Sequence, residues 1–245
     1  MMMIDKERVD FNGLDFHAGE EILIDKPFGW SSFKVVYQIR NAIGWLKIGH
    51  AGTLDPFATG LLILCTGKKT KSISDFQDLE KTYVGTITLG KATASMDLET
   101  EILSEKPFEH ITEANINLLK EEFTGKIMQV PPMYSAVKQK GKNLYKLARE
   151  GKTVERQARE INVSDFKIIS INLPEIHFEI KCSKGTYLRA IANDFGEKLG
   201  CGGVLSSLRR TKIGQFSVDD AISVEEFKKR LKISISIEQK KEYIY

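Results

Sequence analysis

Helix-like and strand-like segments alternate along the whole chain of 245 residues, with no internal repeat or low-complexity tract. Ser31 and Ser32 can cap a helix whose apolar residues recur at helical spacing to Ile43, and Gly44 ends that pattern. Lys81–Leu89 instead alternates as a strand does. This alternation indicates a mixed α/β or α+β architecture.

Other segments continue the alternation. We predict a buried strand at 61–65, helices at 112–123 and 188–199, a short helix within 143–150, and strands across 161–182. With 42% hydrophobic residues, the chain can form one sizeable core or two modest ones.

Composition excludes several classes of protein. No apolar stretch reaches the length of a membrane span, and the first residues lack the apolar core of a secretory signal, so we expect a cytoplasmic protein without a membrane partner. Cys65, Cys182 and Cys201 are far apart and form no Cys-x-x-Cys pair. We therefore expect neither a disulfide framework nor a metal site.

Positive charge is concentrated in one segment. The net charge is only +3, but eight basic residues stand against two acids between Lys138 and Arg159. Such a local excess can bind a polyanion, or it can be a solvated helix face.

Residues 49–60 form a segment with turn chemistry and no hydrophobic period. It holds one carboxylate, Asp55, together with His50, three glycines and no Lys or Arg. Pro56 forces Asp55 into an extended or turn conformation. An Asp before Pro is a common turn initiator, but a lone carboxylate in a firmly held loop also suits a nucleophile.

The run from Gly49 to Leu62, GHAGTLDPFATGLL, resembles the signature of the bacterial TruB family of tRNA pseudouridine synthases. The resemblance implies the α+β pseudouridine synthase fold, with a mixed, mainly antiparallel central sheet flanked by helices and loops. It also implies that Asp55 is the catalytic residue, and that the enzyme isomerises uridine at position 55 in the TΨC loop of tRNA without a cofactor.

Three further segments resemble motifs of the family and imply substrate-binding residues. In Lys81-Thr82-Tyr83 the tyrosine would stack on the target uracil, although a core aromatic is the plainer reading of a strand Tyr. In Ser183–Arg189 the Tyr187 side chain could face the core or the nucleotide. Leu208, in Val204–Gly214, would contact the uridine or lie buried in a strand.

Arg189 has a separate physical argument. If Thr186 is the N-cap, Arg189 lies in the first helical turn, where a cation opposes the helix dipole unless an anion faces it. The family pairs an arginine at this position with the catalytic aspartate, which implies that Arg189 keeps Asp55 ionised.

The basic segment matches the thumb insertion of the family, at about 131–156. This match implies that the basic segment binds the phosphate backbone of RNA. The expected backbone contacts are Lys138, Lys140 and Lys142 in the thumb, with Arg209, Arg210 and Lys212 after the last motif.

The target base must leave a folded loop, at a cost of a few kcal/mol. The resemblance implies that His50 occupies the space that the flipped nucleotide leaves, a steric role rather than that of a general base. The residues leave open whether Asp55 attacks the sugar or the base, or assists through a glycal intermediate.

We expect one catalytic domain over 1–245, without the C-terminal PUA-type domain of many bacterial members, acting as a monomer on the TΨC stem-loop of tRNA. Two alternatives remain: an RNA chaperone that only binds and refolds tRNA, and a dyskerin-like enzyme that relies on guide RNA. The set of Asp55, Tyr83 and Arg189 weighs against the first, and the short C-terminus weighs against a guide RNA.

Overall fold

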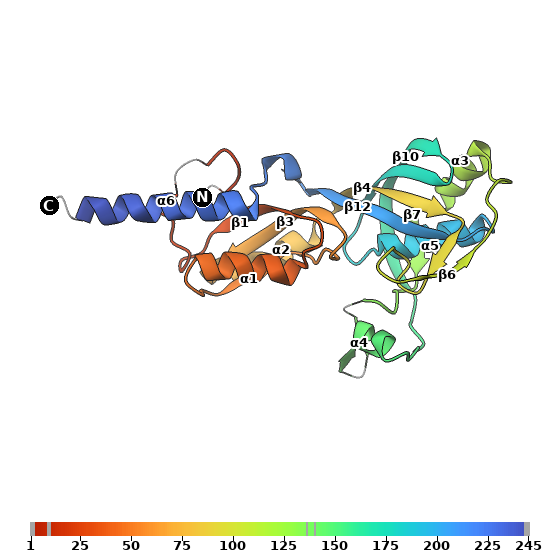
Figure 1. The fold of residues 1–245 in the computed structure, drawn as a ribbon, viewed down its shortest axis with the longest axis horizontal. Coiled ribbons are helices and arrows are strands. Elements are labelled where there is room, and N and C mark those ends of the chain that lie inside the picture. The colour runs from red at the N-terminus through yellow and green to blue at the C-terminus, as the bar shows by residue number, and fades with distance from the viewer. Residues whose placement is uncertain (1–2, 9–10, 136, 140, 243–245) are drawn as a thin grey trace. The chain divides into compact units, whose positions relative to one another are not determined.

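The computed structural model describes residues 3–8, 11–135, 137–139 and 141–242. The chain forms two compact units: unit 1 comprises Met1–Lys81 and Arg209–Tyr245, and unit 2 comprises Thr82–Leu208 (Figure 1). Two strands, β4 (Lys81–Leu89) and β12 (Gly203–Ile213), have residues in both units.

Unit 1 is built on a small mixed sheet. Strand β3 pairs antiparallel with β1 and with β2. It also pairs parallel with the second half of β12, whose last residues pair with β13. The strands are β1 (Glu21–Lys26), β2 (Ile48–His50), β3 (Thr59–Thr66) and β13 (Phe216–Ser217). The helices are α1 (Ser32–Ala42), η1 (Gly67–Ser72), α2 (Ile73–Asp78), η2 (Val218–Asp220) and α6 (Val224–Glu242).

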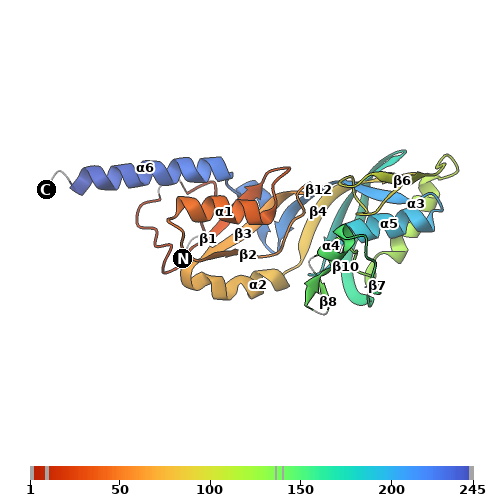
Figure 2. The same cartoon turned by 60° about the horizontal axis from the view of Figure 1, so that its bottom comes forward.

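The sheet of unit 1 is buried on both faces. On one face Ile24 and Leu62 pack with residues of α1 and α6, such as Phe227. On the other face the neighbouring residues Leu23 and Ile63 pack with residues of α2. Because side chains alternate along a strand, continuous apolar runs in β1 and β3 supply both cores, and α1 and α2 lie on opposite sides (Figure 2).

The first helix follows its sequence signals. The Ser31 hydroxyl accepts a hydrogen bond from the Lys34 N–H at 3.1 Å, which caps α1. Val35 and Ile39 are buried on its inner side. Gly44 adopts a φ of 77° directly after the helix, so the predicted start and stop are confirmed.

Unit 2 contains the strand order β4, β11, β10, β7, with the first half of β12 beside β4, and β10 pairs antiparallel with both β11 and β7. Its centre is aromatic: the Phe166 ring lies 6.1 Å from Phe178 and 6.0 Å from Phe195. The remaining strands are β5 (Lys91–Thr93), β6 (Ile102–Glu105), β7 (Gly125–Gln129), β10 (Arg159–Asn172) and β11 (Glu175–Cys182). The long helices are α3 (Glu113–Glu122) and α5 (Leu188–Lys198).

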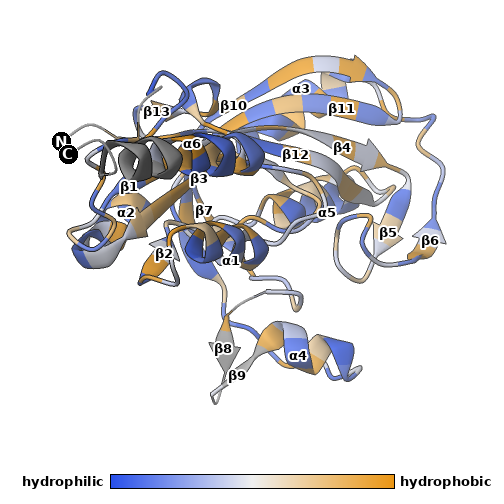
Figure 3. Cartoon of the chain, turned by 60° about the vertical axis from the view of Figure 1, so that its left-hand side comes forward, coloured by the Kyte–Doolittle hydropathy of each residue, from blue (hydrophilic) through white to orange (hydrophobic). Residues whose placement is uncertain are grey.

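The predicted thumb is a separate excursion between β7 and β10. It contains β8 (Lys138–Gln139), β9 (Lys142–Asn143) and α4 (Leu144–Arg149), which lie away from the sheet of unit 2 in Figures 1 and 3. The Arg156 guanidinium donates to the Pro131 carbonyl at 3.2 Å and closes the base of the excursion.

The predicted α+β fold, with its mixed and mainly antiparallel sheet, is confirmed. Two details differ from the sequence reading. The N-cap of α5 is Tyr187 and not Thr186, whose hydroxyl donates to the Ser183 carbonyl at 3.0 Å. The sequence reading also assigned no helix to the end of the chain, where α6 lies.

No described helix is long and apolar enough to cross a membrane. The three cysteines are free thiols and all are buried. Burial raises the pKa of the Cys65 thiol to about 12, so this thiol is unreactive at neutral pH.

Candidate active site

The loop that carries Asp55 is fixed through its main chain by a buried lysine. Lys26, at the end of β1, is fully buried. Its ammonium group donates to the carbonyls of Pro27, Trp30 and Pro56 at 3.0, 2.5 and 3.3 Å. The residue directly after Asp55 is therefore tied to the segment before α1.

A second tie comes from the start of α1. The buried Ser32 hydroxyl accepts from the Leu54 N–H at 2.8 Å, on the other side of Asp55. Ala51, Leu54 and Ala58 are buried, whereas Asp55 is half-buried. The loop is thus anchored on both sides of Asp55, which itself stays half-buried.

Arg210 supports the loop from β12. It is 1% exposed, and it donates to the carbonyls of Leu61 at 2.7 Å and Gly52 at 3.0 Å. A Cβ at Gly60 would lie 2.3 Å from the Arg210 carbonyl, so only glycine allows the two backbones to approach so closely. Arg210 thereby differs from the predicted phosphate contact: its buried guanidinium binds the loop itself.

His50 lies at the end of β2 and is half-buried. Burial lowers the pKa of this imidazole, and the positive charge of Arg210 lowers it further, while the Gly52 backbone opposes both to a smaller extent. The ring is therefore neutral at pH 7. A neutral ring fits the predicted steric role, and that role stays a prediction.

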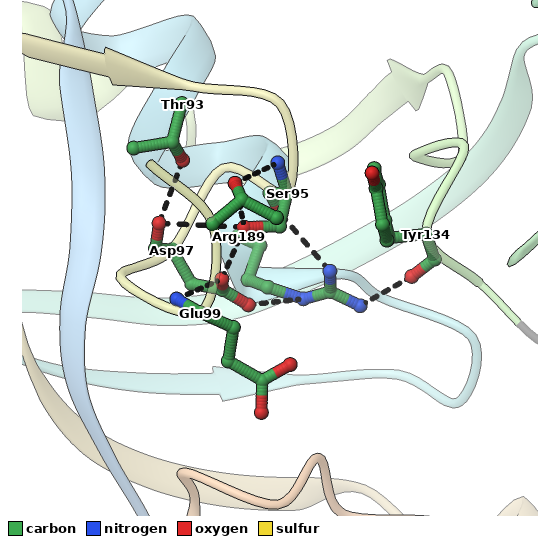
Figure 4. Close-up of polar contacts among 7 residues, drawn as sticks. Thr93, Ser95, Asp97, Glu99, Tyr134 and Arg189 are labelled. Atoms are coloured by element: carbon green, nitrogen blue, oxygen red, sulfur yellow. Dashed lines mark hydrogen bonds and ion pairs between the residues drawn. The ribbon is translucent and has the colours of Figure 1, made fainter. Parts of the chain in front are cut away.

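In unit 2, Arg189 is held by main-chain carbonyls and a carboxylate (Figure 4). It is 5% exposed. Its guanidinium donates to the carbonyls of Ser95 at 3.0 Å and Tyr134 at 2.7 Å. Its Nε lies 3.6 Å from Oδ2 of Asp97, which is fully buried. Arg189 therefore joins the root of the thumb to the turn at 95–97.

Asp97 is a site residue that the sequence reading missed. One carboxylate oxygen accepts from the Glu99 N–H at 2.9 Å and from the Ser95 hydroxyl. The Thr93 hydroxyl donates to the Asp97 carbonyl at 2.6 Å. Hydroxyl residues spaced around one Asp after a strand are typical of a side-chain-capped turn, and this signal could have identified it.

Gln129 is a second residue that was missed. It is 4% exposed, its Nε2 donates to the Tyr187 carbonyl at 3.0 Å, and its Oε1 accepts from the Tyr187 N–H at 2.9 Å. One amide thus fixes both main-chain groups of the residue that begins α5. Gln129 comes just before the thumb, so the thumb root meets the start of α5 at two points.

The remaining substrate-binding candidates also lie in unit 2. Tyr83 is on β4 and is 9% exposed, and Leu208 on β12 is half-buried. Tyr187 is half-buried at the N-cap of α5. Their contacts with a uridine stay predictions. The pairing of Asp55 with Arg189 would join the two units, and it also stays a prediction.

The predicted backbone contacts differ from one another in accessibility. Lys212 is exposed on β12. Arg209 is partly exposed, and its guanidinium binds both carboxylate oxygens of Asp25, at 3.1 and 2.8 Å. Lys140 lies outside the described residues, as do the side chains of Lys138 and Lys142. Within the part of the chain that the structure describes, no group of three or more His, Cys, Asp or Glu side chains could hold a metal ion.

Two family models match consecutive parts of the chain, from residue 40 to residue 243. The TruB family pseudouridylate synthase N-terminal domain matches residues 40–188, more than half of the chain. The C-terminal domain of tRNA pseudouridylate synthase B matches residues 189–243.

Curated relatives match over most of their own length. A tRNA pseudouridine synthase B of Flavobacterium johnsoniae is 48% identical over 89% of this chain and 98% of the relative. One of Chloroherpeton thalassium is 50% identical over 87% of this chain and 90% of the relative.

A solved structure shares the fold. The chain resembles one in the crystal structure of a Cbf5-Nop10-Gar1 complex, with a TM-score of 0.68 and 28% identity. The match covers 87% of this chain and 54% of that one, so this chain spans about half the length of its structural neighbour.

Proposed function

Since the chain belongs to the TruB family of pseudouridylate synthases and is a tRNA pseudouridine synthase, an isomerase that converts uridine in tRNA, we propose that it acts on position 55 of the TΨC loop with Asp55 as its nucleophile. The observation that carries the proposal is the Asp55 loop. Hydrogen bonds between the side chains of Lys26, Ser32 and Arg210 and the main chain fix the loop, and Asp55 within it is half-buried.

The reaction breaks the C1′–N1 glycosidic bond and forms a C1′–C5 bond. The proton that leaves C5 is balanced by the one that N1 gains, so the product is an isomer and no electrons are exchanged. A nucleophile can divide this change into two easier steps through a covalent intermediate. Asp55 is the only carboxylate between residues 26 and 60. A single nucleophile therefore fits the loop better than a pair of carboxylates that exchange protons.

In the proposed mechanism Arg189 pairs with Asp55 and keeps it ionised. Its hydrogen bonds within unit 2 support this role, because a guanidinium that donates to the carbonyls of Ser95 and Tyr134 is already oriented before substrate binds. The proposed uracil contacts are Tyr83, Tyr187 and Leu208.

We also propose that the target nucleotide is flipped out of its loop. Flipping costs a few kcal/mol, which base stacking on Tyr83 and phosphate contacts would offset. The neutral ring of His50 would fill the vacated space. The phosphate contacts would come from the thumb lysines Lys138, Lys140 and Lys142 and from the accessible cations Arg209 and Lys212 on β12.

The same proposal covers the enzyme's setting. We propose a cytoplasmic monomer that recognises the TΨC stem-loop without guide RNA. The tRNA substrate in this proposal is supported by two relatives at 48% and 50% identity that are named tRNA pseudouridine synthase B. We further propose that both units belong to a single catalytic domain.

Position-resolved mapping of pseudouridine tests the proposed target. Purified enzyme is incubated with an unmodified tRNA transcript, with the same transcript carrying cytidine at position 55, and with the isolated stem-loop. We expect pseudouridine at position 55 of the intact transcript and the stem-loop, and none in the cytidine transcript. Pseudouridine formed at another position with equal efficiency would contradict the proposed target.

The RNA chaperone and guide-dependent alternatives make different predictions in the same assay. A chaperone would bind the transcript and leave its uridines unchanged. A guide-dependent enzyme would form product only after a guide RNA is added. Product from enzyme and transcript alone would exclude both.

A further inference from the structure

Helix α1 carries apolar side chains on the side that faces solvent. Its inner side packs Val35 and Ile39 into the core, as is usual for a surface helix. On its outer side, however, Phe33 is 74% exposed and Tyr37 is 46% exposed. An ordinary outer face is polar, so these two rings need another explanation.

A third ring extends this surface beyond the helix. Trp45 is 52% exposed, and its ring lies 5.4 Å from Tyr37 at an interplanar angle of 81°. Exposed cations lie among the rings: Lys34 sits 4.3 Å over Trp30, and the Arg40 guanidinium lies 5.6 Å from the Trp45 ring. We call the surface formed by Phe33, Lys34, Tyr37, Arg40 and Trp45 the aromatic face.

Trp45 is held in a conformation that a bulky residue avoids. Its φ is 63°, in the left-handed region that glycine tolerates. Its N–H donates to the Arg40 carbonyl at 2.8 Å, and its carbonyl accepts from the Arg40 side chain at 3.3 Å. These hydrogen bonds to Arg40 maintain the strained conformation of Trp45, whose indole ring is exposed. Residues held in such conformations cluster at functional sites.

The charge of the segment indicates what the aromatic face binds. Residues 27–54 contain no Asp or Glu, but they include Lys34, Arg40 and Lys47 and both tryptophans of the chain. Flat rings interleaved with cations and free of carboxylates suit a polyanion whose bases are unstacked. Aromatic residues and Arg are also frequent in protein–protein interfaces, so it is the positive charge without any acid that favours a polyanion here.

The aromatic face also connects with the Asp55 loop. The Gly29 N–H donates to the Pro56 carbonyl at 2.9 Å, and Lys26 bonds the carbonyls of both Trp30 and Pro56. A nucleic acid bound at Asp55 is therefore bound beside the segment that leads into α1.

We propose that the aromatic face binds unpaired nucleotides of the tRNA substrate, whose bases stack on Phe33, Tyr37 and Trp45 while Lys34 and Arg40 contact the phosphates. This inference rests on the proposed function, since it assigns a second contact surface to the same substrate. The aromatic face would thus be an RNA-binding surface within unit 1.

The test compares Phe33→Ala, Trp45→Gly and Arg40→Gln with Leu118→Ala. Leu118 is 75% exposed on α3, so Leu118→Ala is a control that removes a similarly exposed apolar side chain outside the aromatic face. Glycine relieves the strain at position 45, so Trp45→Gly should keep its melting temperature. Each variant removes the stacking free energy of one base. We therefore expect the tRNA dissociation constant to rise about tenfold in Phe33→Ala and in Trp45→Gly.

The kinetics and fluorescence provide independent readouts. In the two aromatic variants KM for tRNA should rise by a larger factor than kcat falls. In Arg40→Gln the slope of log affinity against log salt concentration should decrease by the amount expected for about one phosphate contact. Because both tryptophans lie in this segment, tRNA should quench the intrinsic fluorescence of the wild type, and less so in Trp45→Gly. Leu118→Ala should match the wild type throughout.

Unchanged tRNA affinity in Phe33→Ala and Trp45→Gly would overturn the inference. So would a dimer in sedimentation that these variants abolish while tRNA affinity stays the same, because the face would then bind a second copy. Failure of the proposed function is distinguishable: wild-type enzyme would then bind tRNA through this face, with the predicted quenching, and form no pseudouridine at position 55.

Discussion

The two units fix their functional residues in opposite ways. In unit 1, the cations Lys26 and Arg210 donate to main-chain carbonyls and so hold the loop that carries a carboxylate. In unit 2, the main-chain carbonyls of Ser95 and Tyr134 hold a cation, Arg189. The first arrangement leaves its acid half-exposed, whereas the second buries both Arg189 and its partner Asp97.

The difference separates a proposed reactive group from a group that is itself part of the buried structure. Asp55 stays half-buried because its buried neighbours hold its loop in place. Arg189 is itself buried and bonded, so a change there removes a structural ion pair as well as a proposed catalytic group. Variants of Asp55 itself should therefore affect catalysis with little change in stability, and variants of Arg189 should affect both together.

Arg189→Gln should have the largest effect on stability. It leaves Asp97 fully buried without its nearby cation, and breaking a buried pair in this way costs about 3–5 kcal/mol. Urea denaturation measures the loss. In the Asp97→Asn/Arg189→Gln double variant the uncompensated charge is gone, so we expect less destabilisation than in the single variant. A double variant that is less stable by the full sum of the two single effects would break the proposed coupling.

Lys26→Met should have the next largest effect. It keeps the length of the side chain but removes the donor to three carbonyls, and the loss of charged hydrogen bonds should destabilise unit 1 by about 2–3 kcal/mol. Because Pro56 is released, kcat should also fall. Lys68→Met, at an exposed position, is the control. Wild-type kcat in Lys26→Met would show that the loop does not depend on this lysine.

Gln129→Met should have a moderate effect that tests the hold on α5. It removes two hydrogen bonds to Tyr187, at a cost of about 1–2 kcal/mol. If Gln129 positions Tyr187 for the nucleotide, kcat should fall by more than the change in stability explains, and Gln129→Glu, which keeps the acceptor, should lose less activity. Equal activities for the two variants, measured well below their melting temperatures, would indicate a purely structural role.

The smallest effect concerns pH and His50. Its pKa is lowered from 6.5 in the folded chain, so the unfolded chain binds a proton more readily. The contribution of His50 to stability is therefore complete above about pH 6.5 and decreases as the pH falls toward the lowered folded value. Melting temperatures should decline more steeply in this range for the wild type than for His50→Asn. Parallel curves would contradict a buried neutral ring.

Features set by neighbouring residues could be predicted from the sequence. Ser31 and Gly44 bound α1 as expected, and β4 has the predicted ends, because caps and alternation act within a few residues. The local cap at Thr186 was misplaced by one residue, which is the usual uncertainty of a helix end.

Features set by distant residues could not be predicted. Lys26 and Arg210 are charged side chains that would ordinarily be exposed, and only the fold shows that carbonyls far along the chain satisfy them. Asp97 and Gln129 act on α5 from about 60 or more residues away, so no local spacing connects them with it. The polar run around Asp97 is typical of a turn, but it does not identify Arg189 as the partner of this carboxylate.

The most direct test of the account compares the two carboxylates in single turnover. Asp55→Asn and Asp97→Asn are each placed in excess over tRNA, and pseudouridine at position 55 is measured over time together with tRNA affinity. We predict that Asp55→Asn forms no product while binding tRNA within a few fold of the wild type, and that Asp97→Asn forms product slowly. Product formation by Asp55→Asn at the wild-type rate would contradict the assignment of Asp55 as the nucleophile.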